Sequence, residues 1–274
     1  YVYLDLTHLG AETIKKKLPD ITDFVRTYVK IEPIEEPIPV QPTAHYAMGG
    51  IPTDVYSRVL SDEKGTVLPG VYAAGEAACV SVHGANRLGT NSLLDIVVFG
   101  KRAGQSMVDY VTQTKPNSIS DSASDDLSKK IQNLVDKEHT DEFSVANIRK
   151  DLQESMEENA KIFRTKETLE KQTEILQELR GRYENVTIFD KSKVHNSELV
   201  EAIELDYLLD MSEATVASAL ARNESRGAHS RQDFPDRDDT NFMKHSFAFK
   251  KDNTANLKYK DVELGKYEPM ERKY

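Results

Sequence analysis

Apolar side chains recur at helical spacing through the second half of the chain. From Ser144 they lie three or four positions apart in a pattern that continues to Gly181, and the same spacing returns from Asn196 to Arg222. Ser accepts hydrogen bonds from the first amides of a helix, so Ser144 is expected to cap the first of these helices, and the second is expected to run from Asn196 to Arg222. The two amphipathic stretches predict a helical bundle.

The first 115 residues show a different pattern, in which short strand-like segments alternate with helices. The expected elements are, in chain order, a strand at 4–6, helices at 11–18 and 22–28, a proline-punctuated run at 31–42, a turn at 67–70 and a strand at 71–74. This alternation is typical of an α/β fold. We therefore predict an α/β part followed by an α part.

A strongly apolar helix is predicted to begin at Asn91 and Ser92, with Asn91 as its cap. Residues 93–99 are apolar around nearly the whole circumference, as expected of a buried helix. The stretch nevertheless contains Asp95 and, further on, two basic residues, so it is too polar to span a membrane. Any link to a membrane is expected to go through a partner.

A polar segment separates the α/β part from the bundle. Residues 113–128 are rich in Ser, Asp and Pro and nearly devoid of large apolar side chains, which is typical of a solvated linker. The last 50 residues are dense in charge around 224–239 and then alternate near 245–249 and 257–259. We predict a domain boundary in the linker and a small irregular C-terminal domain with a few strands.

Composition excludes several classes of protein. The net charge is −10, with 46 acidic and 36 basic residues, whereas nucleic-acid binders need clustered Lys and Arg. The single cysteine, Cys79, excludes an intrachain disulfide and a multi-cysteine metal or iron-sulfur site within this chain. We therefore expect neither nucleic acid as a partner nor a metal site, and a reducing compartment is the simpler interpretation.

Candidate chemistry gathers between residues 43 and 112. Glu76 follows a predicted strand, where a carboxylate is well placed to accept hydrogen bonds from ribose or ribitol hydroxyls. A solvated loop glutamate is the commoner explanation of an isolated Gly-Glu pair. His45 lies in a glycine-rich turn and is a candidate donor to a carboxylate, whereas His83 and Cys79 are interpreted as structural.

Arg87 lies in a glycine-bounded loop immediately before the apolar helix. A guanidinium binds a carboxylate with two parallel hydrogen bonds, and the first amides of a helix stabilise negative charge. Arg87 is therefore expected to hold an anionic substrate, and Ser92 and Leu93 are expected to face a planar cofactor. The alternative is an ordinary capping loop whose arginine pairs with a surface carboxylate, and for a lone Gly-x-x-Arg that alternative is commoner.

Three separated segments resemble one family. PTAHYAMGGIPT (42–53), GVYAAGEAACVSVHGANRLGTNSLLDIVVFG (70–100) and ESRGAHSRQDFPDRDD (224–239) resemble the flavoprotein subunits of succinate dehydrogenase, respiratory complex II, and the resemblance covers nearly the whole chain. It implies FAD as cofactor and oxidation of succinate to fumarate by hydride transfer. Position by position, His45 and Arg87 correspond to dicarboxylate-binding residues, and Glu76, Ser92 and Leu93 to residues that contact FAD.

The resemblance also implies a domain order. Residues 1–40 correspond to the tail of a capping domain, 41–115 to the returning half of a Rossmann-like FAD-binding domain, 116–128 to a linker, 129–223 to a helical bundle domain and 224–274 to a small irregular α+β domain. The family's dinucleotide fingerprint, its FAD-linking histidine segment and its proton-transferring arginine have no match here. Because the chain begins with Tyr1, we expect it to be a C-terminal piece, with the catalytic arginine upstream and the piece inactive alone.

Related families leave alternatives open. Fumarate reductase flavoproteins have a very similar HGANRLG loop, and L-aspartate oxidase has a comparable Asn-Arg-Leu segment. A non-enzymatic alternative is that residues 144–274 act mainly as a docking module for an iron-sulfur subunit. The expected location is the cytoplasmic face of the bacterial inner membrane, reached through the iron-sulfur and membrane anchor subunits.

Overall fold

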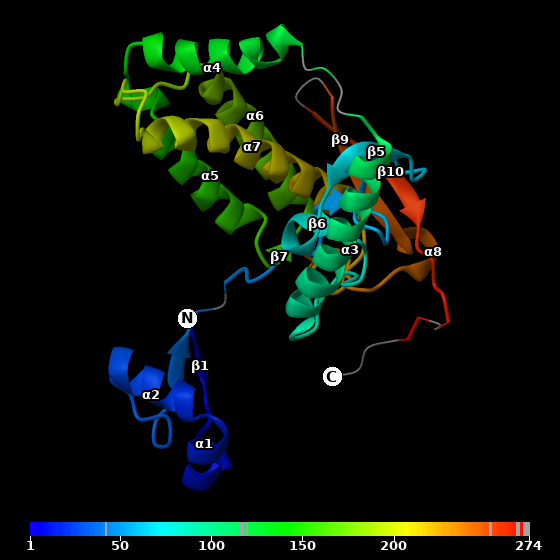
Figure 1. Cartoon of the computed structure of the whole chain (residues 1–274). Coiled ribbons are helices and arrows are strands. Elements are labelled where there is room, and N and C mark those ends of the chain that lie inside the picture. Colours follow the sequence, from blue (N-terminus) through cyan, green and yellow to red (C-terminus); the bar gives the residue numbers. More distant parts are fainter. Residues whose placement is uncertain (42, 116–117, 119, 252–253, 267–268, 271–274) are drawn as a thin grey trace. The chain divides into compact units, whose positions relative to one another are not determined.

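The computed structural model describes residues 1–41, 43–115, 118, 120–251, 254–266 and 269–270 (Figure 1). These residues form two compact units, Tyr1–Tyr46 and Ala47–Tyr274. Position 42 of the predicted proline-rich run and positions 116, 117 and 119 of the predicted linker lie outside the described residues.

The first unit packs two short helices beside a two-stranded sheet. Its elements are β1 (Val2–Leu4), η1 (Thr7–Leu9), α1 (Ala11–Lys17), α2 (Pro19–Tyr28) and β2 (Ile38–Val40). Strands β1 and β2 pair antiparallel, and Ile14, Val25 and Ile38 form the buried interior. Pro19 occupies the first turn of α2, where its fixed φ fits the helix and its missing amide costs nothing. Both predicted helices are confirmed, whereas the predicted strand lies two residues earlier.

The second unit begins with small sheets around one long helix. Its first elements are β3 (Ile51–Pro52), β4 (Arg58–Leu60), β5 (Val67–Tyr72), η2 (Gly75–Ala77), β6 (Ala78–Cys79) and α3 (Asn91–Gln113). Strands β3 and β6 pair in parallel, and β4 and β5 pair antiparallel. The turn predicted at 67–70 is wrong, because these residues continue in β5. Gly70, at φ 81°, instead allows an irregularity within a paired strand.

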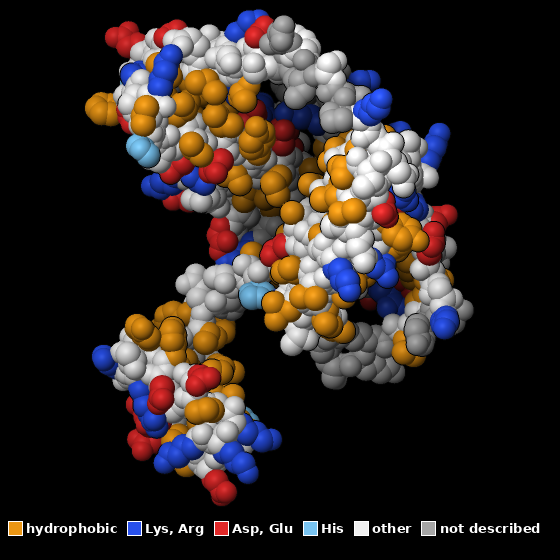
Figure 2. Space-filling model, viewed as in Figure 1, with side chains coloured by type: hydrophobic (Ala, Val, Ile, Leu, Met, Phe, Trp, Pro, Cys, Tyr) orange, Lys and Arg blue, Asp and Glu red, His pale blue; other side chains and the backbone are white. Residues whose placement is uncertain are grey.

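Helix α3 starts at the predicted residue but differs from the prediction in two respects. Its cap is Thr90, at φ 68°, and no side-chain oxygen caps the helix. The expectation of a buried helix is wrong, since Leu93 and Val97 are 66% and 68% exposed. Within α3 the buried residues are Asp95 and Ala103, because only a narrow strip faces β5 and η2. Figure 2 shows hydrophobic side chains at the surface over this helix.

Four helices of 12 to 25 residues follow and form the predicted bundle (Figure 1). The elements are η3 (Asp121–Ser124), α4 (Asp125–Asp136), η4 (Asp141–Phe143), α5 (Val145–Asn159), β7 (Phe163–Arg164), α6 (Lys166–Glu184) and α7 (Ser197–Ala221). The predicted linker is too long at its end, because α4 already begins at Asp125, where two acidic residues suit the positive end of the helix dipole.

The predicted helix from Ser144 to Gly181 is two helices. Helix α5 ends at Asn159, and the chain then forms the short strand β7. A new helix starts because Thr165 accepts the amide of Thr168, whose hydroxyl in turn accepts the amide of Thr165. The cap predicted at Ser144 is confirmed, and the helix predicted from Asn196 has the side chain of Asn196 as its cap.

The interior of the bundle is mostly apolar and comes from α4 to α7 and from the segment between α6 and α7, with Asn159 and Gln172 as a buried hydrogen-bonded pair. The fully buried members include Ile148, Leu169, Ile188, Leu205 and Leu209, each 0% exposed. Such side chains stabilise the fold by roughly 1.5–3 kcal/mol each relative to an exposed position. The bundle therefore supplies the largest apolar core of the described residues.

The chain ends in β8 (Ser230–Arg231), α8 (Asp239–Phe242) and the hairpin β9 (Lys244–Lys251) and β10 (Thr254–Asp261). Strand β8 pairs in parallel with β7, which joins the end of the chain to the break between α5 and α6. The two predicted strand segments near 245–249 and 257–259 are confirmed as the hairpin.

Candidate functional site

The predicted substrate loop runs from the end of β6 into α3. Its side chain His83 contacts the carboxylate of Asp95 at 2.9 Å between Nε2 and Oδ2, and Asp95 is 4% exposed. This contact fixes the start of the loop to the first turns of α3. It agrees with the structural role expected for His83. Asp95 was not predicted as the partner of His83, although a lone carboxylate in an apolar helix was a usable signal.

Arg87 lies near the middle of the loop and is half-buried. Its Nη1 donates to the carbonyl of Leu88 at 3.4 Å, a contact near the limit of a hydrogen bond. The guanidinium therefore lies in the segment that leads directly to the N-terminus of α3. A carboxylate held there would meet the fork-shaped donor of arginine and the positive end of a helix dipole together.

The first turn of α3 carries the two residues expected to contact the cofactor. The amide of Leu93 donates to the carbonyl of Thr90 at 3.1 Å, so this amide closes the first turn of the helix. Ser92 is half-buried and precedes it. Both residues lie at the positive end of α3, which suits an electron-rich planar group. Their contact with FAD stays a prediction.

Glu76 lies in η2, between β5 and β6, and joins two distant segments. Its Oε1 accepts the amide of Ala47 at 3.1 Å, and its side chain is exposed. The same two segments touch at Gly50, where an added Cβ would lie 2.6 Å from the carbonyl oxygen of Ala77. Only glycine allows this approach, which explains one of the paired glycines in the sequence.

A small cavity lies beside this contact. It has a volume of about 20 Å³ and is lined by Met48, Gly49, Ala78, Cys79, Val80, Ser81, His83, Gly84 and Asp95. The structure therefore brings the glycine-rich segment, β6 and the start of the substrate loop together. An exposed carboxylate suits the hydroxyl groups of FAD and a helix N-terminus suits its electron-rich ring, so these residues fit that part of the cofactor.

His45 belongs to the first unit and is exposed. Arg87, Glu76, Ser92 and Leu93 all belong to the second unit. That His45 and Arg87 bind the same dicarboxylate therefore stays a prediction.

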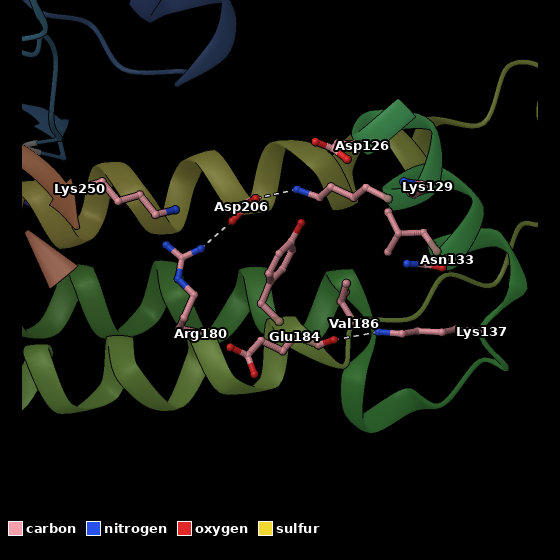
Figure 3. A pocket seen from close by; sticks show the side chains of 12 residues that line it. Asp126, Lys129, Asn133, Lys137, Arg180, Glu184, Val186, Asp206 and Lys250 are labelled. Atoms are coloured by element: carbon pink, nitrogen blue, oxygen red, sulfur yellow. Dashed lines mark hydrogen bonds and ion pairs between the residues drawn. The ribbon is translucent and has the colours of Figure 1, made fainter. Parts of the chain in front are cut away.

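A larger cavity of about 480 Å³ lies in the helical bundle, and Figure 3 shows the side chains around it. Several of its cations are paired: Lys130 binds Asp206 at 2.6 Å, and Arg180 binds Asp206 at 2.6 Å and Asp210 at 2.5 Å. Lys250 of β9 also binds Asp210, at 2.6 Å. We interpret this cavity as the edge of an ion network that joins α4, α6, α7 and β9.

The comparisons with known proteins cover most of the chain. Residues 149–274 match the family described as fumarate reductase flavoprotein C-term, and residues 1–93 match the FAD binding domain family. Within the described part of the chain, no helix combines the length and the apolar character needed to cross a membrane.

Relatives carry two related names. A succinate dehydrogenase flavoprotein subunit of Rickettsia bellii is 45% identical over 253 residues, which is 90% of this chain and 42% of the relative. A fumarate reductase flavoprotein subunit of Serratia is 42% identical, with 100% of this chain and 45% of the relative covered. The chain thus spans less than half the length of these relatives.

Solved structures agree with the sequence relatives. E. coli quinol fumarate reductase matches with a TM-score of 0.85 and 39% identity, over 98% of this chain and 45% of the solved chain. The family's cofactor is FAD, in agreement with the match of residues 1–93 to the FAD binding domain family. Family models, relatives and fold agree, and the chain belongs to the succinate dehydrogenase and fumarate reductase flavoprotein family.

Proposed function

We propose that this chain contributes the dicarboxylate-binding and flavin-facing loop of an enzyme that interconverts succinate and fumarate. The observation that carries the proposal is the position of Arg87, in a loop that His83 anchors to Asp95 and that ends at the N-terminus of α3. FAD, when bound, supplies the two-electron acceptor. The chain's own residues supply binding and orientation.

Each residue has a distinct task in this proposal. Arg87 binds one carboxylate of the substrate through two parallel hydrogen bonds, and His45 donates to the other carboxylate. Glu76 accepts hydrogen bonds from cofactor hydroxyls, while the first turn of α3, with Ser92 and Leu93, lies against the ring. Holding the substrate in one orientation relative to the ring lowers the entropic part of the barrier.

Substitution of Arg87 tests the proposal. Arg87→Lys keeps the charge but removes the fork of donors, so kcat/KM for succinate should fall by about 100-fold or more in the full-length, FAD-loaded protein. Lys101→Arg, an exposed change on α3, is the matched control and should leave kcat/KM within twofold. A near-parental kcat/KM for Arg87→Lys would show that the carboxylate is bound elsewhere.

The direction of the reaction is part of the proposal. We infer oxidation of succinate as the principal activity, because Ile51–Thr53 after the glycine pair and the Ala78–Val82 segment before His83 resemble the succinate dehydrogenase side of the family. Assays of succinate oxidation, fumarate reduction and L-aspartate oxidation with the same preparation separate the three alternatives. Rapid L-aspartate oxidation would replace the proposal with that of an aspartate oxidase.

Electron transfer requires a second protein in this proposal. We propose that an iron-sulfur subunit binds the flavoprotein and that the complex attaches to the membrane through anchor subunits. Relatives such as a quinol-fumarate reductase solved with menaquinol support a quinone as the distant electron carrier. Co-purification with an iron-sulfur protein, lost when residues 144–274 are deleted, is the expected result.

A further inference from the structure

The substrate loop makes a second contact, far along the chain from the first. The amide of Ala228 donates to the carbonyl of Ala85 at 2.8 Å. Ala85 lies two residues before Arg87 and two after His83. Because a backbone carbonyl is fixed by this bond, the contact restrains the path of the loop itself rather than one flexible side chain.

Ala228 belongs to a tight turn whose geometry explains its glycine. Arg226 and His229 exchange backbone hydrogen bonds of 2.8 and 3.1 Å across the turn. Gly227, at φ 58°, takes the first central position, which glycine occupies in a two-residue hairpin turn. A Cβ added to Gly227 would lie 2.6 Å from the carbonyl carbon of Ala85 and 2.9 Å from its Cβ. The turn therefore lies directly against the substrate loop.

A buried carboxylate holds the turn in place. Glu224 is 0% exposed and accepts hydrogen bonds from Arg226 at 2.8 and 2.9 Å, from Arg222 at 2.7 Å and from the amide of Asp238 at 2.8 Å. Burial acts to raise the pKa of Glu224, but these hydrogen bonds outweigh it and hold the pKa below its ordinary value. Glu224 is therefore ionised, and it binds both Arg222, which precedes the turn, and Arg226, which begins it.

The loop that carries Arg87 is thus held at two points. His83 is bound to Asp95 of α3, and Ala85 is bound to Ala228 of the C-terminal segment. Arg87 is the charged residue that follows both anchors directly. We propose that Gly227 and Ala228 are positioning residues, which press the turn onto Ala85 and so hold Arg87 in the orientation that binds the dicarboxylate. This inference rests on the role of Arg87 in the proposed function.

Two substitutions test the turn in the FAD-loaded protein. Gly227→Ala adds the Cβ that meets Ala85, and Ala228→Pro removes the amide that donates to it. Each should raise KM for succinate about five- to tenfold, with a smaller change in kcat and unchanged FAD content. Gly265→Ala is the matched control for the first, because Gly265 has a similar φ of 63° but open space around it. Ala228→Ser keeps the amide and is the control for the second.

A double-mutant cycle separates positioning from general stability. If the turn acts through Arg87, Gly227→Ala should raise KM far less in an Arg87→Lys background than in the parent protein. Equal effects in both backgrounds, or unchanged KM in both turn variants, would overturn the inference. An Arg87→Lys variant with parental KM would instead overturn the proposed function and the positioning role together. A raised KM for Arg87→Lys with parental turn variants would overturn the positioning role alone.

Discussion

The helical bundle and the segment 222–239 have interiors of opposite kinds. The bundle buries apolar side chains such as Leu169 and Leu205, whereas the segment buries Glu224 and Arg231, which are 0% and 1% exposed. Apolar burial releases free energy without requiring particular partners. A buried charge is tolerated only when it is paired, and its net contribution to stability is small.

The difference indicates that the two regions have different structural roles. Arg231 binds Asp233 at 2.8 Å and donates to the carbonyls of Ala219 and Leu220, so it fixes the end of α7 to the segment. Each such bond has a defined direction, which apolar contacts lack. The bundle thus provides stability, and the segment provides the exact position of the turn against the substrate loop.

The strongest test of this comparison removes the buried charge. Glu224→Gln keeps the shape of the side chain but leaves Arg222 without its buried anion and Arg226 paired with Asp239 alone, so the free energy of unfolding should fall by about 3–5 kcal/mol. Urea denaturation measures the change. Glu154→Gln, which removes an exposed pair with Lys150 at 3.8 Å, is the control and should change stability by about 0–1 kcal/mol.

The two regions should also differ in their effect on substrate binding. Leu205→Ala opens a cavity in the bundle and should lower the free energy of unfolding by about 3 kcal/mol. KM for succinate should nevertheless stay within twofold of the parent at temperatures where both are folded, whereas Glu224→Gln should raise it. A rise in KM for Leu205→Ala equal to that for Glu224→Gln would show that the two regions do not differ in their effect on substrate binding.

A smaller effect should appear in the pH dependence of stability. Burial lowers the pKa of His229, the carbonyl of Arg222 acts against this, and the nearby Arg164, Arg222 and Arg231 lower it further. In the unfolded chain His229 therefore binds a proton near pH 6.5, whereas in the folded protein it binds that proton only at a lower pH. Stability from neutral His229 is complete above about pH 6.5 and is lost as pH falls below it.

Denaturation of the parent and of His229→Gln between pH 5 and 8 measures this contribution. The variant should lose less stability on acidification than the parent does. His245→Gln on β9 is the comparison, since burial also lowers the pKa of His245. This variant should also lose less stability on acidification than the parent does, and its effect should add to that of His229→Gln. Identical pH profiles for the parent and His229→Gln would assign the acid sensitivity to other groups.

Much of the secondary structure follows from local sequence. The cap at Ser144, the helix from Asn196 and the two helices of the first unit were predictable, because apolar spacing and hydrogen-bonding side chains act within a few residues. The break at Ala160–Thr165 was not predictable in this way. It depends on the pairing of β7 with β8, which lies far along the chain.

The loop that carries Arg87 could be located from the sequence, but the contacts that support it could not. HGANRLG identified the loop and Arg87 directly, while the anchors at Asp95 and Ala228 depend on contacts across the fold. The surface of α3 was mispredicted for a related reason. Periodicity shows that side chains are apolar, but burial depends on which other elements lie against them.

The bond between Ala85 and Ala228 has a consequence for the timing of synthesis. About half of the chain separates the two residues, so during translation the loop leaves the ribosome long before the turn that holds it. Contacts of such long range form late, because a large loop must first close. On the proposed role of the turn, the newly made protein acquires high affinity for substrate only after the segment that carries Ala228 has folded back onto the loop.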